Sequence, residues 1–283
     1  MNHLNLKKVR ASLGSISIAL SVITFSSLSA QAAAIRSGFD GNTLAANDDD
    51  STGLVSLGFD VNFFGLTFDE LYVNNNGNVT FDSPLSLFTP FDLTSTAQQI
   101  IAPFFADVDT RNSDPVTYSN GTVDGRNAFG VNWIDVGYFY QRNDPLNSFQ
   151  LVLIDRSDIA VGDFDIEFNY DQILWETGEA SEGTDGLGGF SARAGFSNGT
   201  GDSGTFFELQ GSAINGAFLN GGSNALISNS LDSDVDGRYI FSARNGAIDT
   251  PDPVSTPEPF FLLGLLTVGV ITACSTSKQS KNN

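Results

Sequence analysis

Residues 71–81 constrain the fold more than any other stretch, because two alternating runs flank a turn. Apolar residues such as Val73 and Val79 alternate with polar or amphipathic neighbours on both sides of that turn. Between the runs, Asn75, Asn76 and Gly77 tolerate positive φ, which is a strong signal for a β-hairpin. Turn chemistry accounts for every residue without a ligand, so the pattern predicts structure and stops short of function.

Alternating or apolar runs bounded by turn residues recur along the chain and predict further strands. They cover residues 54–64, 100–105, 129–136, 149–154, 164–170, 192–196, 205–209 and 238–243. Turns are expected at 120–121, 124–125, 198–199 and 220–222, and one helical turn at 95–101. The sequence therefore predicts an all-β fold, an antiparallel β-sandwich or flattened barrel of about ten strands, flanked by an N-terminal signal helix and a C-terminal hydrophobic helix.

The hairpin and several later segments also carry a resemblance to a known family. The segments are 63–65, 71–81, 102–111, 149–153, 175–178, 194–196 and 237–241. In this order they resemble the nidogen-type extracellular (NIDO) domain over residues 44–245. Phe105 stands where the family usually has Trp, and Asp236 where Pro commonly precedes the last strand. The resemblance implies a secreted domain that works in adhesion or in the extracellular matrix, and it names no ligand.

Charge and residue usage exclude several classes of function. The chain has 33 acidic and 13 basic residues, a net charge of −20, and five of the basic residues lie in the end segments. Such a surface disfavours nucleic acid as a partner, because a phosphate backbone must be neutralised by basic side chains. The one His is His3 and the one Cys is Cys274, both outside the expected domain at 35–246. Disulfides, Cys/His zinc sites and His- or Cys-based catalysis are thereby excluded from that domain.

The first segment, residues 1–34, has the pattern of a secretory signal peptide. A basic start precedes an apolar, Ser-rich stretch, and small residues follow at Ala30, Ala32 and Ala34 with the spacing that signal peptidase recognises. A membrane anchor is the alternative, but serines interrupt the apolar stretch, which makes it too weak for a comfortable span of about 20 residues. We expect cleavage after Ala32 or Ala34.

The last two segments predict export and sorting. Residues 247–259 form a Pro-rich linker that ends in Pro257, Glu258 and Pro259, and residues 260–283 form a hydrophobic helix and a basic tail. Together they resemble the PEP-CTERM sorting signal, although two Lys replace the usual Arg cluster. The resemblance implies an exosortase-like membrane protease as a partner, a protein that is secreted or held at the cell envelope, and a tail that lies transiently or permanently in the membrane.

Two groups of carboxylates are candidate Ca²⁺ ligands. Asp107 and Asp109 point to the same side of an extended chain, where they either hold the ion or pair with Arg111, and the ion pair is the simpler interpretation.

The second group, Asp232, Asp234 and Asp236, matches the opening of a Ca²⁺ loop but lacks the bidentate Glu at its twelfth position, so an acidic turn is the alternative. The run at residues 48–50 is expected to be a solvated loop.

The leading prediction is a non-enzymatic adhesion or matrix module with no cofactor except a Ca²⁺ ion at one of these groups. Extracellular polysaccharide or a matrix protein is the expected partner. A Ca²⁺-dependent carbohydrate-binding module is the first alternative, and a glycosidase with a carboxylate pair is the second. Neither alternative has a motif of its own in the sequence.

Overall fold

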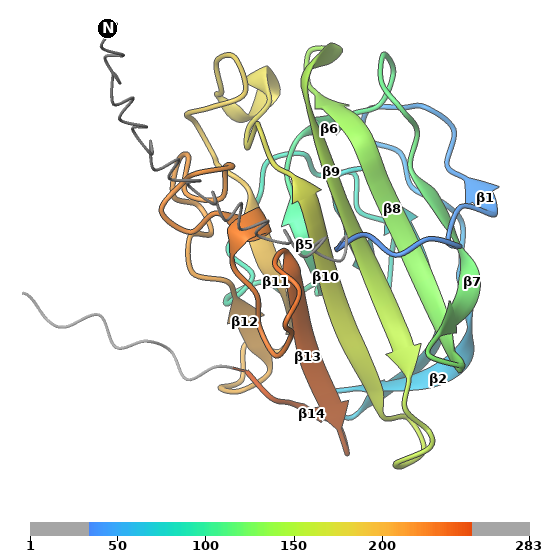
Figure 1. Ribbon diagram of the computed structural model, residues 1–283. Helices are drawn as coiled ribbons and strands as arrows, with labels where there is room; N and C mark the ends of the chain where they lie inside the picture. The colour runs from blue at the N-terminus through green and yellow to red at the C-terminus, as the bar shows by residue number, and fades with distance from the viewer. Residues whose placement is uncertain (1–33, 251–283) are drawn as a thin grey trace, which may run out of the picture.

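A computed structural model of the chain describes residues 34–250, which form two antiparallel β-sheets packed face to face (Figure 1). The predicted all-β sandwich is therefore confirmed. The signal helix and the C-terminal hydrophobic helix lie outside the described residues. Within residues 34–250, the structure contains no helix that is long and apolar enough to cross a membrane.

The larger sheet has eight strands, and the longest of them form its centre. Its order is β1 (Asn42–Thr43), β7 (Thr117–Val123), β8 (Arg126–Tyr138), β9 (Arg142–Asp155), β10 (Phe164–Gln172), β13 (Arg238–Arg244) and β14 (Ala247–Ile248). A short strand, β6 (Val108–Asp109), also pairs with β8.

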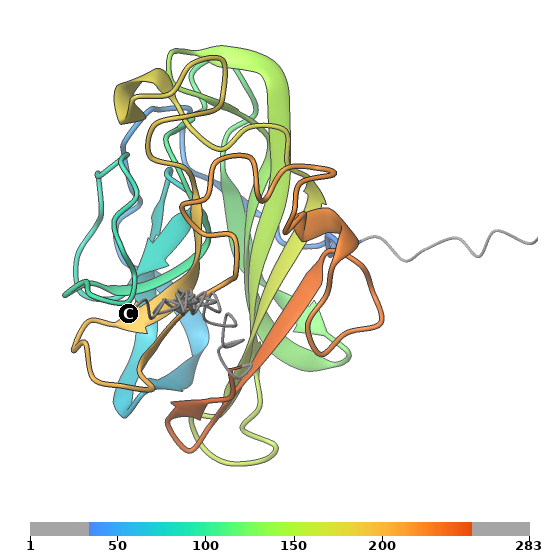
Figure 2. The same cartoon turned by 90° about the vertical axis from the view of Figure 1, so that its left-hand side faces the viewer.

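The smaller sheet has six strands and contains the predicted hairpin. Its order is β12 (Phe206–Glu208), β11 (Arg193–Asn198), β5 (Gln99–Phe105), β4 (Asn78–Thr80), β3 (Leu66–Asn74) and β2 (Val55–Phe63). Two 3-10 turns, η1 (Glu179–Ser181) and η2 (Leu226–Ser228), lie in the connections. Figure 2 shows the two layers from the side, with η1 (yellow) near the top.

Aromatic side chains from both sheets fill the space between them. Trp133 of β8 stacks on Phe149 of β9 with ring centroids 5.2 Å apart, and Phe104 of β5 reaches across to Phe149 at 5.1 Å. Phe196 of β11 meets Phe241 of β13 in the same way at 5.2 Å. Large buried aromatics contribute most of the burial in such a core, so the sandwich holds together within residues 34–250 without a disulfide.

Residues 34–40 close the outer face of the larger sheet over a buried polar network. Arg36 Nε donates to Glu167 Oε1 at 2.6 Å, and the Arg36 amide donates to Gln150 Oε1 at 3.0 Å. Arg238 Nη2 donates to the carbonyl of Ala34 at 2.7 Å. Because Glu167 and Gln150 are fully buried, these bonds satisfy groups that would otherwise be costly to bury.

Two local predictions are wrong. Residues 95–101 contain no helical turn, since β5 begins at Gln99 and pairs there with β11. Residues 120–121 do not turn either, because both lie within β7, where Gly121 pairs with Ala128 of β8. Gly121 leaves room for Phe39, whose ring would lie only 2.8 Å from a Cβ at that position.

Candidate functional site

The predicted turn between β3 and β4 is buried, and its asparagines hold two distant segments together. Asn75 Nδ2 donates to the carbonyls of Asp48 and Val108, both at 2.6 Å. Asn76 Oδ1 accepts from the Val108 amide at 2.9 Å, and Asn76 Nδ2 donates to Asp49 Oδ1 at 2.8 Å. The turn therefore places the loop at residues 47–50 against the connection between β5 and β6.

That placement creates a cluster of three carboxylates, which we call the acidic cluster: Asp48, Asp49 and Asp107. One oxygen from each lies within 4.8 Å of the others. Asp107 is 1% exposed, whereas Asp48 and Asp49 are partly open to solvent. Among residues 34–250 this is the one group of three or more acidic residues that meets so closely.

The pKa values of all three carboxyl groups in the cluster are raised, first by burial and then by neighbouring carboxylates. Burial, followed by repulsion from Asp48 and Asp49, raises the pKa of Asp107 to about 8. Burial and the nearby Asp109 carboxylate raise the pKa of Asp48 to about 6, and burial also raises the pKa of Asp49. Because all three pKa values are raised, the cluster favours the uptake of a positive charge, either a proton or a metal ion.

The two predicted ligands Asp107 and Asp109 have separate environments. Asp109 is fully buried, and its Oδ1 accepts from Arg111 Nε at 2.9 Å, as the ion-pair interpretation predicts. Arg111 Nη2 also lies 3.0 Å from Asp48 Oδ2. The Asp107 carboxylate accepts no hydrogen bond from Arg111, and it lies close to the Asp48 and Asp49 carboxylates of the loop at residues 47–50.

Two more segments cover the acidic cluster. The Phe139 amide donates to the Asp107 carbonyl at 3.1 Å, and the Gln141 amide donates to Asp109 Oδ2 at 2.8 Å. Tyr140, between them, is 67% exposed. Gly178 approaches from the other side, where a Cβ would lie 2.4 Å from Asp107 Oδ2.

The other predicted Ca²⁺ ligands do not converge. Asp232, Asp234 and Asp236 are all exposed in the loop before β13, and their carboxylates do not approach one another as those of the acidic cluster do. Asp48 and Asp49 are not among the candidate ligands singled out from the sequence, because the sequence predicts a solvated run there. The contact across 27 residues between Asp49 and Asn76 has no local signal in the sequence.

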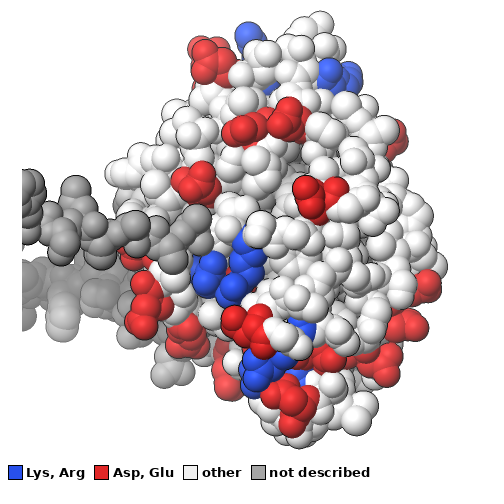
Figure 3. Space-filling view, turned by 45° about the vertical axis from the view of Figure 1, so that its right-hand side comes forward, with Lys and Arg blue, Asp and Glu red and all other residues white. Residues whose placement is uncertain are grey.

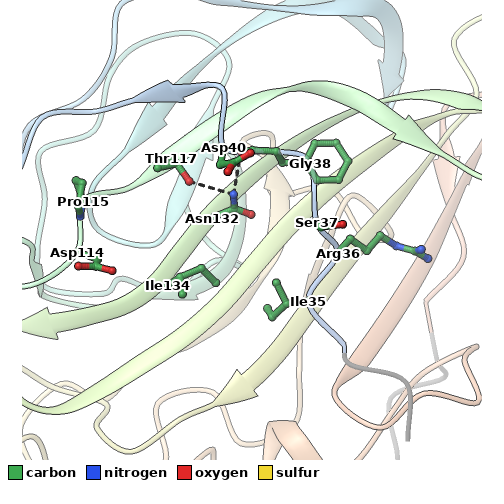
Figure 4. A pocket seen from close by; sticks show the side chains of 11 residues that line it. Ile35, Arg36, Ser37, Gly38, Asp40, Asp114, Pro115, Thr117, Asn132 and Ile134 are labelled. Carbon is green, nitrogen blue, oxygen red and sulfur yellow. Dashed lines mark hydrogen bonds between the residues drawn. The ribbon is translucent and has the colours of Figure 1, made fainter. Parts of the chain in front are cut away.

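A concave region lies on the outer face of the larger sheet, beside residues 34–40 (Figure 4). It encloses about 350 Å³ and is lined by Ile35, Asp114 and Ile134 among others. Asn132 Nδ2 donates across it to the Phe39 carbonyl at 2.8 Å and to Thr117 Oγ1 at 3.0 Å. These bonds join the N-terminal segment to the sheet, which gives this region a structural role.

Charge is unevenly distributed over the surface (Figure 3). Basic and acidic side chains mix in one cluster in the lower part of this face and again at its top, while acidic side chains are scattered between and around them. The ion pairs on the outer side of the larger sheet include Arg36 with Glu167 and Arg156 with Asp165 at 2.8 Å. Most basic side chains of the described residues are thus already neutralised.

Comparison with known proteins places these features in a family context. The family model for the nidogen-like domain matches residues 69–124 and 116–245. Alpha-tectorin of Mus musculus is 33% identical over 243 residues, which cover 77% of this chain and 11% of that protein. Nidogen of Drosophila melanogaster is 29% identical over 246 residues, which cover 76% of this chain and 16% of that protein.

The chain thus spans between about a tenth and a sixth of the length of these relatives. No solved structure matches it. The family match confirms the resemblance to the nidogen-type domain that the hairpin and the later segments predict.

Proposed function

The chain belongs to the nidogen-like domain family, and on this premise we propose that it is a secreted, non-enzymatic module that binds components of an extracellular matrix. The observation that carries the proposal is its similarity, over about three quarters of its length, to alpha-tectorin and nidogen, which are extracellular matrix proteins. Partners of those proteins are not transferred here, since this chain covers only a small part of them.

The geometry supports binding through one end of the sandwich. The β8–β9 turn and η1 lie at the same end of the sandwich in Figure 1. The Phe139 amide of that turn donates to the Asp107 carbonyl, which places this end beside the acidic cluster. Three large apolar side chains are exposed there: Leu87 at 52%, Tyr140 at 67% and Phe190 at 49%. The Glu179 amide donates to the Phe139 carbonyl, and the Phe190 amide donates to the Ser181 carbonyl. The loop that contains η1 therefore connects Phe190 to the β8–β9 turn, which carries Tyr140.

We call this region, formed by Leu87, Tyr140 and Phe190 around the acidic cluster, the loop surface. Exposed aromatic residues held on a rigid scaffold supply contact area at low entropic cost, so this surface is suited to contact with a partner. The alternative of Ca²⁺-dependent carbohydrate binding rests on the same surface, because both neighbours of Tyr140 in sequence donate backbone hydrogen bonds to Asp107 and Asp109.

Export and sorting belong to the same proposal. Signal peptidase would remove residues 1–34 or a slightly shorter piece, and an exosortase-like protease would process the chain near Pro257, Glu258 and Pro259. Residues 1–33 and the stretch from Pro257 to Pro259 lie outside the described residues. Their support is the sequence pattern and the extracellular setting of the relatives.

A binding experiment on variants of the loop surface tests the proposal. Purified protein is titrated onto matrix material from the producing cells, and saturable binding is expected. A Tyr140→Ser, Phe190→Ser double variant should bind at least about tenfold more weakly, because exposed aromatic anchors carry a large share of interface energy. Val161→Ser is the matched control, since Val161 is 86% exposed at the opposite end of β9.

Equal binding by the double variant and the control would overturn the assignment of the loop surface. A glycan array with and without chelator separates the alternatives. Chelator-sensitive binding to defined sugars would favour the carbohydrate-binding module. Release of reducing ends from the same glycans would indicate a glycosidase and would contradict the non-enzymatic proposal.

A further inference from the structure

Asp107 is a buried carboxylate without a partner. The side chain is 1% exposed, and neither of its oxygens has a hydrogen-bond donor within residues 34–250. The Ser181 amide on the covering loop lies near Asp107 and opposes the rise of its pKa, but its hydrogen bond goes to the Gly178 carbonyl, at 3.1 Å. Since a buried carboxylate is costly unless paired, this group requires a positive partner.

The unpartnered side chain is aimed at two further carboxylates from a distant part of the chain. Asp48 Oδ1 is also buried without a hydrogen-bond partner in the described chain, while Asp49 Oδ1 accepts from Asn76 Nδ2. The oxygens of the three residues lie within 4.8 Å of one another. That span is about twice the distance of 2.3–2.6 Å at which an oxygen ligand binds Ca²⁺.

The one basic side chain that contacts the cluster compensates only part of its charge. Arg111 makes two bonds to Asp109 and one ion pair to Asp48 Oδ2, and it makes none to Asp107. The four carboxyl groups of this region, those of Asp48, Asp49, Asp107 and Asp109, outnumber the one guanidinium that contacts them. A divalent cation would redress the balance, whereas a proton would neutralise only one group.

We propose that Asp48, Asp49 and Asp107 bind one Ca²⁺ ion at the loop surface. Asp107 supplies a buried ligand from the connection between β5 and β6, and the other two supply partly exposed ligands from the loop at residues 47–50. Ca²⁺ takes six to eight oxygen ligands and accepts water at the open side, which this half-open arrangement allows. Mg²⁺ fits less well, because it requires oxygens at about 2.0–2.1 Å in strict octahedral geometry.

The ion would fasten together segments that are distant in sequence. Asn75 and Asn76 already hold the loop at residues 47–50 in place, and the Asp107 carbonyl accepts from the Phe139 amide beside the exposed Tyr140. Bound Ca²⁺ would therefore stiffen the loop surface. The metal site does not depend on the proposed matrix partner, so either assignment can fail without the other.

Calorimetric titration of CaCl₂ into chelator-treated purified protein tests the site. Wild-type protein is expected to bind one ion saturably, and a 100-fold excess over Kd should raise Tm by about 5–10 °C. Asp107→Asn should weaken Ca²⁺ binding by about tenfold or more, because it removes the buried charge. The variant should still fold, since it also removes repulsion from Asp48 and Asp49.

Asp234→Asn is the matched control, because it removes the same charge from an exposed site outside the cluster, and it should bind Ca²⁺ like the wild type. Asp49→Asn serves as a second variant and should also weaken binding. Absence of saturable binding by wild type up to 10 mM Ca²⁺, about tenfold above the Kd of the weakest extracellular sites, would overturn the proposal. Unchanged Ca²⁺ affinity in Asp107→Asn would overturn it as well, and so would a loss of affinity in Asp234→Asn equal to that in Asp107→Asn. If the wild type binds Mg²⁺ as tightly as Ca²⁺, the choice of Ca²⁺ is refuted.

Discussion

Replacing Gly77 with Ala should destabilise the fold strongly, because this glycine is at the closest approach between the buried turn and β5. Gly77 has φ +72°, and a Cβ would lie 1.8 Å from the Phe104 carbonyl oxygen and 2.7 Å from its carbon. A backbone atom cannot swing aside as a side chain does. The turn would have to move, which disturbs the bond from the Phe104 amide to the Gly77 carbonyl at 3.2 Å and the pairing of β4 with β5.

Two contributions set the magnitude. Placing Ala in the left-handed region costs about 1–2 kcal/mol, and overpacking a buried contact costs about 1–3 kcal/mol more. The sum, about 2–5 kcal/mol, corresponds to a fall in Tm of about 4–20 °C, at about 2–4 °C per kcal/mol for a domain of this size. Thermal unfolding followed by circular dichroism, with urea unfolding as a check, measures it.

Gly125→Ala is the matched control for this prediction. Gly125 lies in the β7–β8 turn with φ +78°, and a Cβ there would meet nothing within 4 Å. It should therefore lose only the backbone contribution of about 1–2 kcal/mol. If the two variants lose the same stability, the close contact between the turn and Phe104 does not limit the fold, and the reasoning fails.

Three further predictions concern pH and the two ends of the chain. In chelator, the free energy of unfolding should fall as pH rises from about 4 to 8, because Asp107 keeps its proton up to a pKa of about 8 in the folded protein but loses it near 3.8 in the unfolded chain. Urea unfolding across that pH range measures the fall. If Asp107→Asn shows the same fall with pH, Asp107 is not its origin. N-terminal sequencing of secreted protein should show cleavage after Ala32, because cleavage after Ala34 would remove the carbonyl to which Arg238 donates a hydrogen bond. A mature chain that starts at Ile35 would contradict this prediction. Deleting residues 260–283 should release a folded domain, since the last strand, β14, ends at Ile248. Mass spectrometry of wild-type surface material should find no peptide that contains Cys274. Recovery of such a peptide from full-length surface protein would favour a membrane anchor.

The strands of the sandwich could be predicted because their signal is local. Alternating residues and turn residues predicted strands β2 to β5 and β8 to β13, but not the 3-10 turns between them. The turn expected at 124–125 is confirmed by the positive φ of Asp124 and Gly125. The strand β7 was missed because its sequence, with Asn120 and Gly121, resembles a turn. Its strand conformation is imposed by pairing with β8 and by the packing of Phe39, which are tertiary contacts.

The acidic cluster could be predicted only in part. Asp107 was a candidate from its own segment, and the bond between Arg111 and Asp109 follows from their spacing of two residues. The partners Asp48 and Asp49 come from a loop about 60 residues away in sequence, brought there by Asn75 and Asn76. Such a contact depends on the whole fold, so no spacing rule in the sequence indicates it.

Fractionation of the producing culture tests the central claim, a matrix module, most directly. Quantitative immunoblotting of cell, membrane, soluble medium and matrix fractions measures where the protein resides. We predict that most wild-type protein is found in the matrix fraction and that the Tyr140→Ser, Phe190→Ser variant shifts to the soluble medium at equal total amount. Residence of the wild type inside the cells, or free in the medium at the same level as the variant, would contradict the account.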